Sequence, residues 1–281
     1  MTGRVSLVGA GPGDPGLLTR RAVARLRAAD LVLYDALVDD RVLALARRAQ
    51  RFFVGKRAGR HALSQSSIHA IMIRAARRGR RVVRLKGGDP FVYGRGGEEA
   101  LALQQAGIPF EIVPGVSSLL AGPALAGIPV THRGRAASVL VTTGHDVEAF
   151  GRTVHGLAAP EAREGLTLIV AMGFGRRAAL SGCLLGAGWP AETPAAIVAG
   201  ASLPTEQVWR GSLGGVVRGE DSVTGDDPAI LIVGEVAALD LRALAERIVT
   251  GAASTGPAES LGSNDARDVS SAQALRMSRT P

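Results

Sequence analysis

Apolar runs alternate with stretches of helical spacing through the first half of the chain. Short apolar runs begin near Val5 and Leu31, and residues 17–30 between them have the apolar spacing of a helix. Strands that alternate with helices are typical of a mostly parallel sheet with crossover helices. The same pattern predicts the other elements of this half: strands at 51–56, 80–88 and 110–115, a helix from Ser64 or Ser66 to Gly79, a helix at about 97–105, and a short helix of small residues at 117–129.

The pattern changes after residues 131–133, where strands become more frequent and helices fewer. A hairpin-like pair within 195–213 suggests antiparallel pairing. We therefore expect an α/β protein of two α/β domains, with a mostly parallel sheet in residues 1–115 and a mixed sheet in residues 116–248. Residues 249–281 are rich in Ser, Gly, Ala and Asp without a sustained period, which predicts a disordered tail. The predicted strands of the second half are 137–145, 166–173, 195–202, 205–213 and 229–236.

The first turn has the glycines of a dinucleotide-binding loop but lacks the last of them. An apolar run leads into Gly9-Ala10-Gly11, and the third glycine of the Rossmann pattern would fall at position 14, where the chain has Asp14. A carboxylate there repels pyrophosphate, and Pro12 removes one of the N–H donors that would bind it. Asp35 argues for a dinucleotide, because it ends the second strand where a ribose-binding acid would fall. An NAD-binding protein is therefore a disfavoured alternative.

Charge and composition narrow the possible partners. The net charge is +8 with 33 basic residues, of which only Lys56 and Lys86 are lysines. Arginine doublets are scattered near expected helix ends, where they complement the helix dipole. Aromatic residues make up only 4% of the chain, which leaves little for base stacking. A solvated basic face is favoured over a nucleic-acid groove, and an acidic small molecule is a third possibility.

Cysteine and histidine usage gives no indication of a metal. The single cysteine, Cys183, excludes an internal disulfide and a multi-thiolate metal site. No histidine pair has ligand spacing with carboxylates or thiols, so no metal is expected. Neither a run of about 18 apolar residues nor a basic leader before an apolar core is present. We expect a soluble cytoplasmic protein that binds neither membrane nor nucleic acid.

The strongest chemical signal is the stretch RLKGGDPFVYGRGGEEAL, residues 84–101. Gly87 and Gly88 allow the backbone to approach a ligand without interference from a Cβ atom. Asp89 then follows the strand at the edge where open α/β sheets bind ligands. Arg95 lies in a second glycine turn together with Glu98, whereas the neighbouring Glu99 is expected only to offset the helix dipole.

Seven motifs resemble, in order, those of the uroporphyrinogen-III C-methyltransferase family of tetrapyrrole methylases. The resemblance covers about residues 4–240 and implies two α/β domains with a ligand cleft between them, assembled as a homodimer. It further implies methyl transfer from S-adenosylmethionine to carbons 2 and 7 of uroporphyrinogen III, giving precorrin-2 for sirohaem and cobalamin synthesis. A methylase of this fold that acts on a later precorrin is the nearest alternative. The motifs are VGAGPGDPGLLT, VLYDALV, FVGKRAG, LKGGDPFVYGRGGEE, VPGVSS, AGIPVTHR and AILIVGEV.

The resemblance also implies the residues that hold the methyl donor. S-adenosylmethionine has no phosphate and carries a positive sulfonium, so it suits a turn with Pro12 and Asp14 better than NAD does. Small residues, Ala171 and Gly200-Ala201, stand where the family usually has an aromatic residue and an Asn-Gly pair, which predicts a remodelled adenine pocket. Leu119 and Leu120 are also bulkier than usual. The expected cofactor-binding residues are Pro12, Gly87, Gly88, Asp89, Val92, Ser117, Ser118, Met172 and Ala201.

The tetrapyrrole is a polyanion, so arginines are expected to bind it. Arg95 and Arg133 stand in family motifs, and their forked side chains suit bidentate binding of carboxylates. The resemblance matches Asp35 to the proton acceptor of the family and Lys56 to its proton donor. Glu98, beside Arg95, is a competing base.

Overall fold

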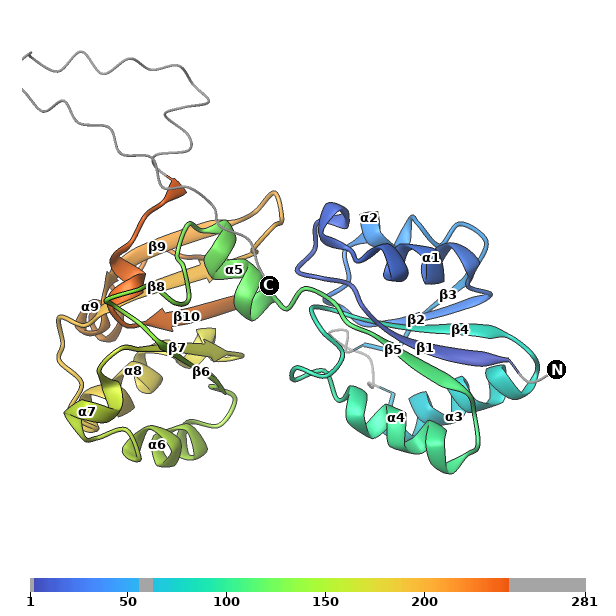
Figure 1. Cartoon of the computed structure of the whole chain (residues 1–281), viewed down its shortest axis with the longest axis horizontal. Helices are drawn as coiled ribbons and strands as arrows, with labels where there is room; N and C mark the ends of the chain where they lie inside the picture. The colour runs from blue at the N-terminus through green and yellow to red at the C-terminus, as the bar shows by residue number, and fades with distance from the viewer. Residues whose placement is uncertain (1–2, 56–62, 243–281) are drawn as a thin grey trace, which may run out of the picture. The chain divides into compact units, whose positions relative to one another are not determined.

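The computed structural model describes residues 3–55 and 63–242 (Figure 1). Lys56 and the expected disordered tail, 249–281, lie outside the described residues. The described part contains two five-stranded sheets. The expected division at residue 115 remains a prediction; it falls in the connection between the last strand of the first sheet and the first helix that packs on the second.

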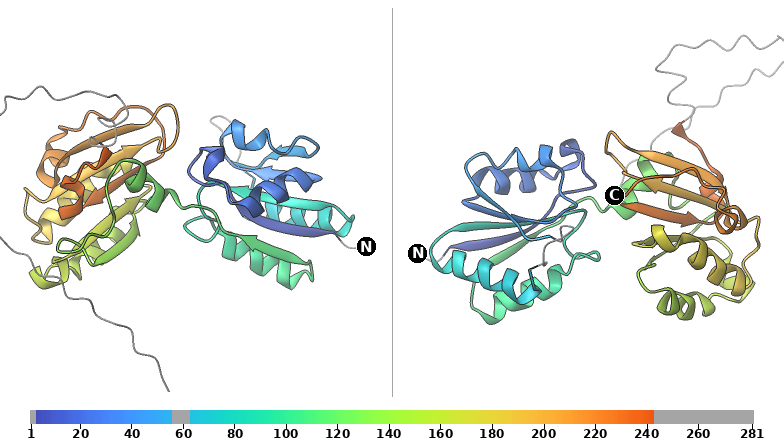
Figure 2. Two further views of the ribbon diagram at one scale, coloured as in Figure 1. Left: turned by 45° about the horizontal axis from the view of Figure 1, so that its top comes forward. Right: turned by 180° about the vertical axis from the view of Figure 1, so that it is seen from behind.

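The first sheet is parallel throughout and has the strand order β3-β2-β4-β1-β5. Figures 1 and 2 show α1 and α2 over one face of this sheet and α3 and α4 over the other. Both faces are apolar, so helices cover each of them, as is usual for parallel sheets. The elements are β1 (Arg4–Gly9), α1 (Arg20–Ala28), β2 (Leu31–Tyr34), α2 (Asp40–Leu43), β3 (Gln50–Phe53), α3 (Gln65–Arg77), β4 (Arg81–Lys86), α4 (Gly96–Gln105) and β5 (Phe110–Val113), with a 3-10 turn, η1, at Pro15–Leu17.

The second sheet is mixed and has the strand order β6-β7-β10-β8-β9. β6 and β7 are parallel, and the other neighbours are antiparallel, including β8 and β9, which form the expected pair within 195–213. One face carries α6 and α8, and α5 packs against the other. The elements are α5 (Ser118–Leu125), β6 (Ser138–Thr143), α6 (Val147–His155), α7 (Pro160–Arg163), β7 (Leu166–Ala171), η2 (Phe174–Arg176), α8 (Arg177–Gly186), β8 (Pro194–Ala199), β9 (Gln207–Ser212), α9 (Leu213–Arg218), β10 (Ala229–Val233) and η3 (Glu235–Ala238).

Side-chain caps explain where several helices begin. Thr19 accepts a hydrogen bond from the backbone N–H of Ala22, so α1 starts at Arg20, three residues later than expected. Of the two serines expected to cap α3, Ser64 is the cap, and it accepts from Ser67 N at 3.1 Å. Each cap satisfies a backbone donor that the first helical turn leaves unpaired. Within the described ranges, no helix has the length and apolar character needed to span a bilayer.

Three backbone segments meet closely at the carboxyl edge of the first sheet. The loops after β1 and β4 are bridged by Gly11 and Gly88, whose N–H and C=O groups exchange hydrogen bonds of 3.2 and 2.8 Å. A Cβ atom on Gly9 would lie 2.5 Å from the carbonyl oxygen of Gly88 and 2.6 Å from the Cα of Gly115. Only glycine at these positions allows the loops to pack this tightly. The packing fixes the backbone at the edge where ligands bind in α/β sheets.

Candidate functional site

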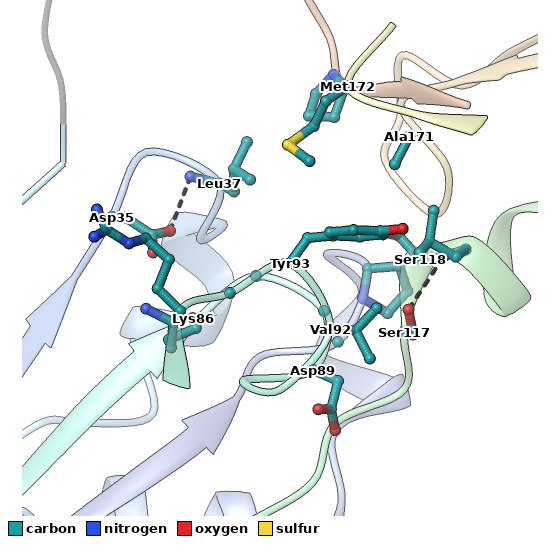
Figure 3. Close-up of a pocket in the computed structure, with 18 of the residues that line it drawn as sticks. Asp35, Leu37, Lys86, Asp89, Val92, Tyr93, Ser117, Ser118, Ala171 and Met172 are labelled. Carbon is teal, nitrogen blue, oxygen red and sulfur yellow. Dashed lines mark hydrogen bonds between the residues drawn. The ribbon is translucent and has the colours of Figure 1, made fainter. Parts of the chain in front are cut away.

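A cavity of about 410 Å³ opens at this carboxyl edge. Loops after β1, β2 and β4 line it together with loops after β7, β8 and the approach to β10, so both sheets contribute. Figure 3 shows the side chains of Leu37, Tyr93 and Met172 directed toward one open space, with Asp35 and Lys86 on one side of it. The volume is within the range of small-molecule pockets.

Most of the expected site residues line this cavity. All of the residues expected to hold the methyl donor do so, and so do Asp35 and Arg95. Glu98 and Arg133 are not among the lining residues; Arg133 is exposed in the turn that joins His132 to Ala136. Lys56 lies outside the described residues. The roles assigned to all of these residues stay predictions.

The carboxylate of Asp14 lies in the first loop, where a dinucleotide-binding protein would hold a phosphate. Its Oδ1 accepts a hydrogen bond of 2.7 Å from Gly16 N and so caps η1. The backbone N–H of Asp14 donates to Ser202 Oγ at 3.0 Å, from a loop of the second sheet. A pyrophosphate in this turn would meet a negative charge and donors that are already used.

Asp89 ties two loops of the site together. Its Oδ1 accepts a hydrogen bond from Phe91 N at 2.8 Å, and its Oδ2 accepts from Gly115 N at 3.0 Å. The carboxylate therefore holds the loop after β4 against the loop after β5. Each oxygen keeps a lone pair that a ligand can use.

We expect Asp89→Ala to weaken both the fold and the site. The partly buried Gly115 N–H would lose its acceptor, which should cost about 1 kcal/mol of unfolding free energy, the low end of the range for a buried donor. Urea unfolding and titration with S-adenosylhomocysteine measure the two effects. Asp89→Asn keeps one carbonyl acceptor and serves as the matched control, with a smaller loss of stability. Equal stability of Asp89→Ala and wild type would contradict the tie between the loops.

Arg95 and Glu98 form an exposed pair at the mouth of the cavity. Arg95 Nη2 donates to Glu98 Oε2 at 2.6 Å, and the two side chains are 59% and 51% exposed. The hydrogen bond from Arg95 holds the pKa of Glu98 below its ordinary value. The lower basicity makes Glu98 a weaker proton acceptor. The guanidinium of Arg95 can turn from Glu98 to another carboxylate in solvent at little cost.

A buried charged cluster behind the cavity was missed by the sequence reasoning. It comprises Arg84 and Lys86 on β4, each 4% exposed, and Glu99 on α4, fully buried. Glu99 Oε1 accepts from Arg84 Nε at 3.0 Å, from Lys86 Nζ at 3.1 Å and from Gln65 Nε2 at 3.2 Å. Glu99 was expected only to offset the helix dipole, and the structure gives it three donors instead. The available signal was the alternation of Arg84 and Lys86, which puts two cations on one face of a central strand.

The cluster reaches the cavity through Arg84, Lys86 and Asp35. Arg84 Nη2 lies 3.4 Å from Asp35 Oδ2, and all three side chains line the cavity whereas Glu99 does not. Burial lowers the pKa of the Lys86 ammonium below its ordinary value, and the neighbouring Arg84 lowers it further, against an opposing contribution from Glu99. The inner side of the cavity thus carries two cations, Arg84 and Lys86, and one carboxylate, Asp35.

Backbone strain is concentrated around the cavity. Within the described ranges, four residues other than glycine have positive φ: Tyr93 (52°), Arg95 (56°), Met172 (55°) and Ser202 (69°). The first three line the cavity, and Ser202 follows Ala201, which also lines it. Such conformations cost about 1–3 kcal/mol each and cluster at functional sites. Among the described residues, no group of three or more His, Cys, Asp and Glu side chains could hold a metal ion.

Comparisons with known proteins agree with the motif resemblance. A family model described as tetrapyrrole (corrin/porphyrin) methylases matches residues 4–217. The siroheme synthase of Actinobacillus pleuropneumoniae serotype 7 is 45% identical over 238 residues, which are 84% of this chain and 48% of that protein. The chain thus spans about half the length of the curated relatives it matches.

Solved structures extend the likeness to the fold. A crystal structure of uroporphyrin-III C-methyltransferase from Thermus thermophilus has 43% identity and a TM-score of 0.70, covering 84% of this chain and 96% of that one. Another from the same organism, complexed with S-adenyl homocysteine, has 44% identity and a TM-score of 0.68, covering 83% and 98%. The expected fold and family are therefore confirmed: this chain is a member of the tetrapyrrole methylase family.

Proposed function

We propose that the chain transfers methyl groups from S-adenosylmethionine to carbons 2 and 7 of uroporphyrinogen III and so makes precorrin-2. The observation that carries this proposal is the cavity at the carboxyl edge, whose wall contains every residue expected to hold the methyl donor. The similarity to a uroporphyrin-III C-methyltransferase over nearly the whole of that protein supports the same substrate. The product would feed sirohaem and cobalamin synthesis.

The methyl donor fits the glycine-lined part of the cavity. Gly87 and Gly88, which lack a Cβ atom, allow its amino-acid end to approach the loop after β4 closely, and Ser117 and Ser118 line the same cavity at the start of α5. Met172 and the small residue Ala201 would contact the adenine and ribose. A positive sulfonium is compatible with the carboxylate of Asp14 in the first loop, whereas a diphosphate in that loop is not.

The tetrapyrrole fits the open, apolar side of the cavity. Leu37 is 60% exposed, Met172 53% and Tyr93 45%, which is an unusual grouping of bare apolar side chains at the mouth of a pocket. These side chains would pack on the macrocycle, and Arg95 would bind one of its carboxylates. Arg133 would reach the ring only from outside the cavity, from its exposed turn.

The chemistry needs alignment and a proton acceptor. A pyrrole carbon attacks the methyl carbon, the bond from methyl to sulfur breaks, and the electron pair leaves on sulfur as a neutral thioether. Holding the three atoms in line can contribute about 7–11 kcal/mol in the best cases. The methylated ring then loses a proton, for which Asp35 is the acceptor we favour because it lines the cavity. General base assistance is worth about 10²–10⁴ in rate.

The assembly is inferred from the family resemblance, and the location from the sequence. We propose a homodimer that works in the cytoplasm, with two domains that meet at residue 115. Light scattering on the purified protein measures its mass in solution. We expect the mass of two chains, and the mass of one chain would exclude the dimer.

Labelled methyl transfer tests the proposed function directly. Uroporphyrinogen III is incubated anaerobically with methyl-labelled S-adenosylmethionine, and the product is analysed by mass. We expect two added methyl groups. If this protein leaves uroporphyrinogen III unchanged but methylates a later precorrin, the alternative function is the correct one. Calorimetric titration provides the control for the cofactor: S-adenosylhomocysteine should bind, and NAD(H) should not.

A further inference from the structure

Lys86 is a buried cation that faces the cavity with hydrogen-bonding capacity to spare. The residue is 4% exposed, lines the cavity, and ends β4 directly before Gly87. Among the described residues its ammonium makes one hydrogen bond, to Glu99 Oε1 at 3.1 Å. An ammonium has three donors, so two of them have no acceptor there.

The other cations of the cavity wall are already engaged. Arg84 donates to Glu99 Oε1, to the carbonyl oxygens of Leu33 and Leu85, and to Asp35 Oδ2. These four contacts occupy nearly all of its five donors. Arg95 is paired with Glu98 at the exposed mouth. Of the two buried cations in the described cavity wall, Lys86 is therefore the one that an incoming anion can reach without breaking an existing pair.

The hydrogen bonds of the cluster are unevenly distributed: within the part of the chain that the structure describes, Glu99 Oε2 is buried without a partner, and Lys86 bonds only to Oε1. One oxygen of Glu99 serves both Arg84 and Lys86, so two buried cations share a single acceptor atom. Burying an ammonium without full compensation is costly, and the lowered pKa of Lys86 reflects this. A carboxylate entering from the cavity would accept from the ammonium donors that Lys86 does not use for Glu99.

We propose that Lys86 anchors one acetate carboxylate of the tetrapyrrole and makes the site selective for rings that carry acetate side chains. The inference rests on the proposed function and names a determinant of its specificity. Carbons 2 and 7 of uroporphyrinogen III each bear an acetate. A ring carbon placed against a methyl donor at Gly87 and Gly88 therefore brings its acetate toward the adjacent Lys86.

Binding without turnover tests this anchor. Wild type, Lys86→Gln and Lys86→Met are loaded with S-adenosylhomocysteine and titrated anaerobically with uroporphyrinogen III and with coproporphyrinogen III, in which methyl groups replace the acetates. We expect wild type to prefer uroporphyrinogen III. Both variants should bind it roughly 10- to 100-fold more weakly, the usual effect of losing a charged hydrogen bond, with little change for coproporphyrinogen III.

The comparison of two ligands separates an anchor from a structural role. A merely structural role for Lys86 would weaken both ligands equally, and unchanged preference in either folded variant overturns the proposal. Lys86→Gln keeps a donor for Glu99, so it should fold even if Lys86→Met does not. Arg81→Gln removes an equal charge from the exposed opposite end of β4 and should keep the wild-type preference. Wild type that binds no tetrapyrrole and transfers no methyl group would instead refute the proposed function.

Discussion

Replacing Gly9 with alanine is expected to abolish methyl transfer and to lower the unfolding free energy by about 3 kcal/mol. The new Cβ atom would lie 2.5 Å from Gly88 O and 2.6 Å from both the Cα and the N of Gly115. All three are backbone atoms, so no change of rotamer relieves the clash. The loops after β4 and β5 would have to separate, and the proposed methyl-donor site lies on both of them.

Chemical denaturation and titration with S-adenosylhomocysteine measure the loss for Gly9→Ala. Gly182→Ala is the matched control, because Gly182 lies within α8 and an added Cβ there meets nothing within 4 Å. It should raise the unfolding free energy by about 0.5–1 kcal/mol, since alanine favours the helix. Wild-type stability and ligand affinity in Gly9→Ala would show that the three loops can move apart freely.

The second large effect is expected for Glu99→Leu, which should lower the unfolding free energy by about 3–5 kcal/mol. Glu99 is fully buried and is the carboxylate that pairs with both Arg84 and Lys86. Without Glu99, Arg84 keeps one carboxylate contact, to Asp35 at 3.4 Å, and Lys86 loses its paired carboxylate. The midpoint of urea unfolding measures the effect.

Two further variants separate lost pairing from lost packing. The triple variant Arg84→Met, Lys86→Met, Glu99→Leu removes all three charges and should recover most of the stability, because apolar replacements of a buried ion cluster are often neutral. Glu98→Leu, one residue earlier on α4, removes a 51% exposed carboxylate and should leave the unfolding midpoint near that of wild type. A Glu99→Leu protein as stable as wild type would mean that the buried cations need no counter-charge.

Local sequence patterns were sufficient to predict the helices and strands but not the strand order of the second sheet. Alternating strands and helices led to the parallel first sheet, and the pair within 195–213 was anticipated from its spacing. The position of β10 between β7 and β8 depends on pairings between residues that lie 30 to 65 positions apart, which no short window contains. Such long-range pairings are decided by tertiary packing.

Some residues of the candidate site could also be predicted from local sequence, and others could not. Gly87, Gly88 and Asp89 could be placed at the cavity because they follow a predicted strand at the edge where open α/β sheets bind ligands. Glu99 was misjudged, because its position in a first helical turn has a sufficient local explanation and only the packed structure shows that it is buried. Arg133 is a different case: it stands in a family motif but does not line the cavity, and its role stays a prediction.

The residues with positive φ around the cavity have a consequence for protein engineering. Tyr93, Arg95 and Met172 hold conformations that glycine or asparagine would adopt more readily. Selection for heat resistance alone would therefore favour substitutions at these positions. Each such gain would remove a side chain from the rim proposed to receive the macrocycle, so under the proposed function higher stability would come with lower turnover.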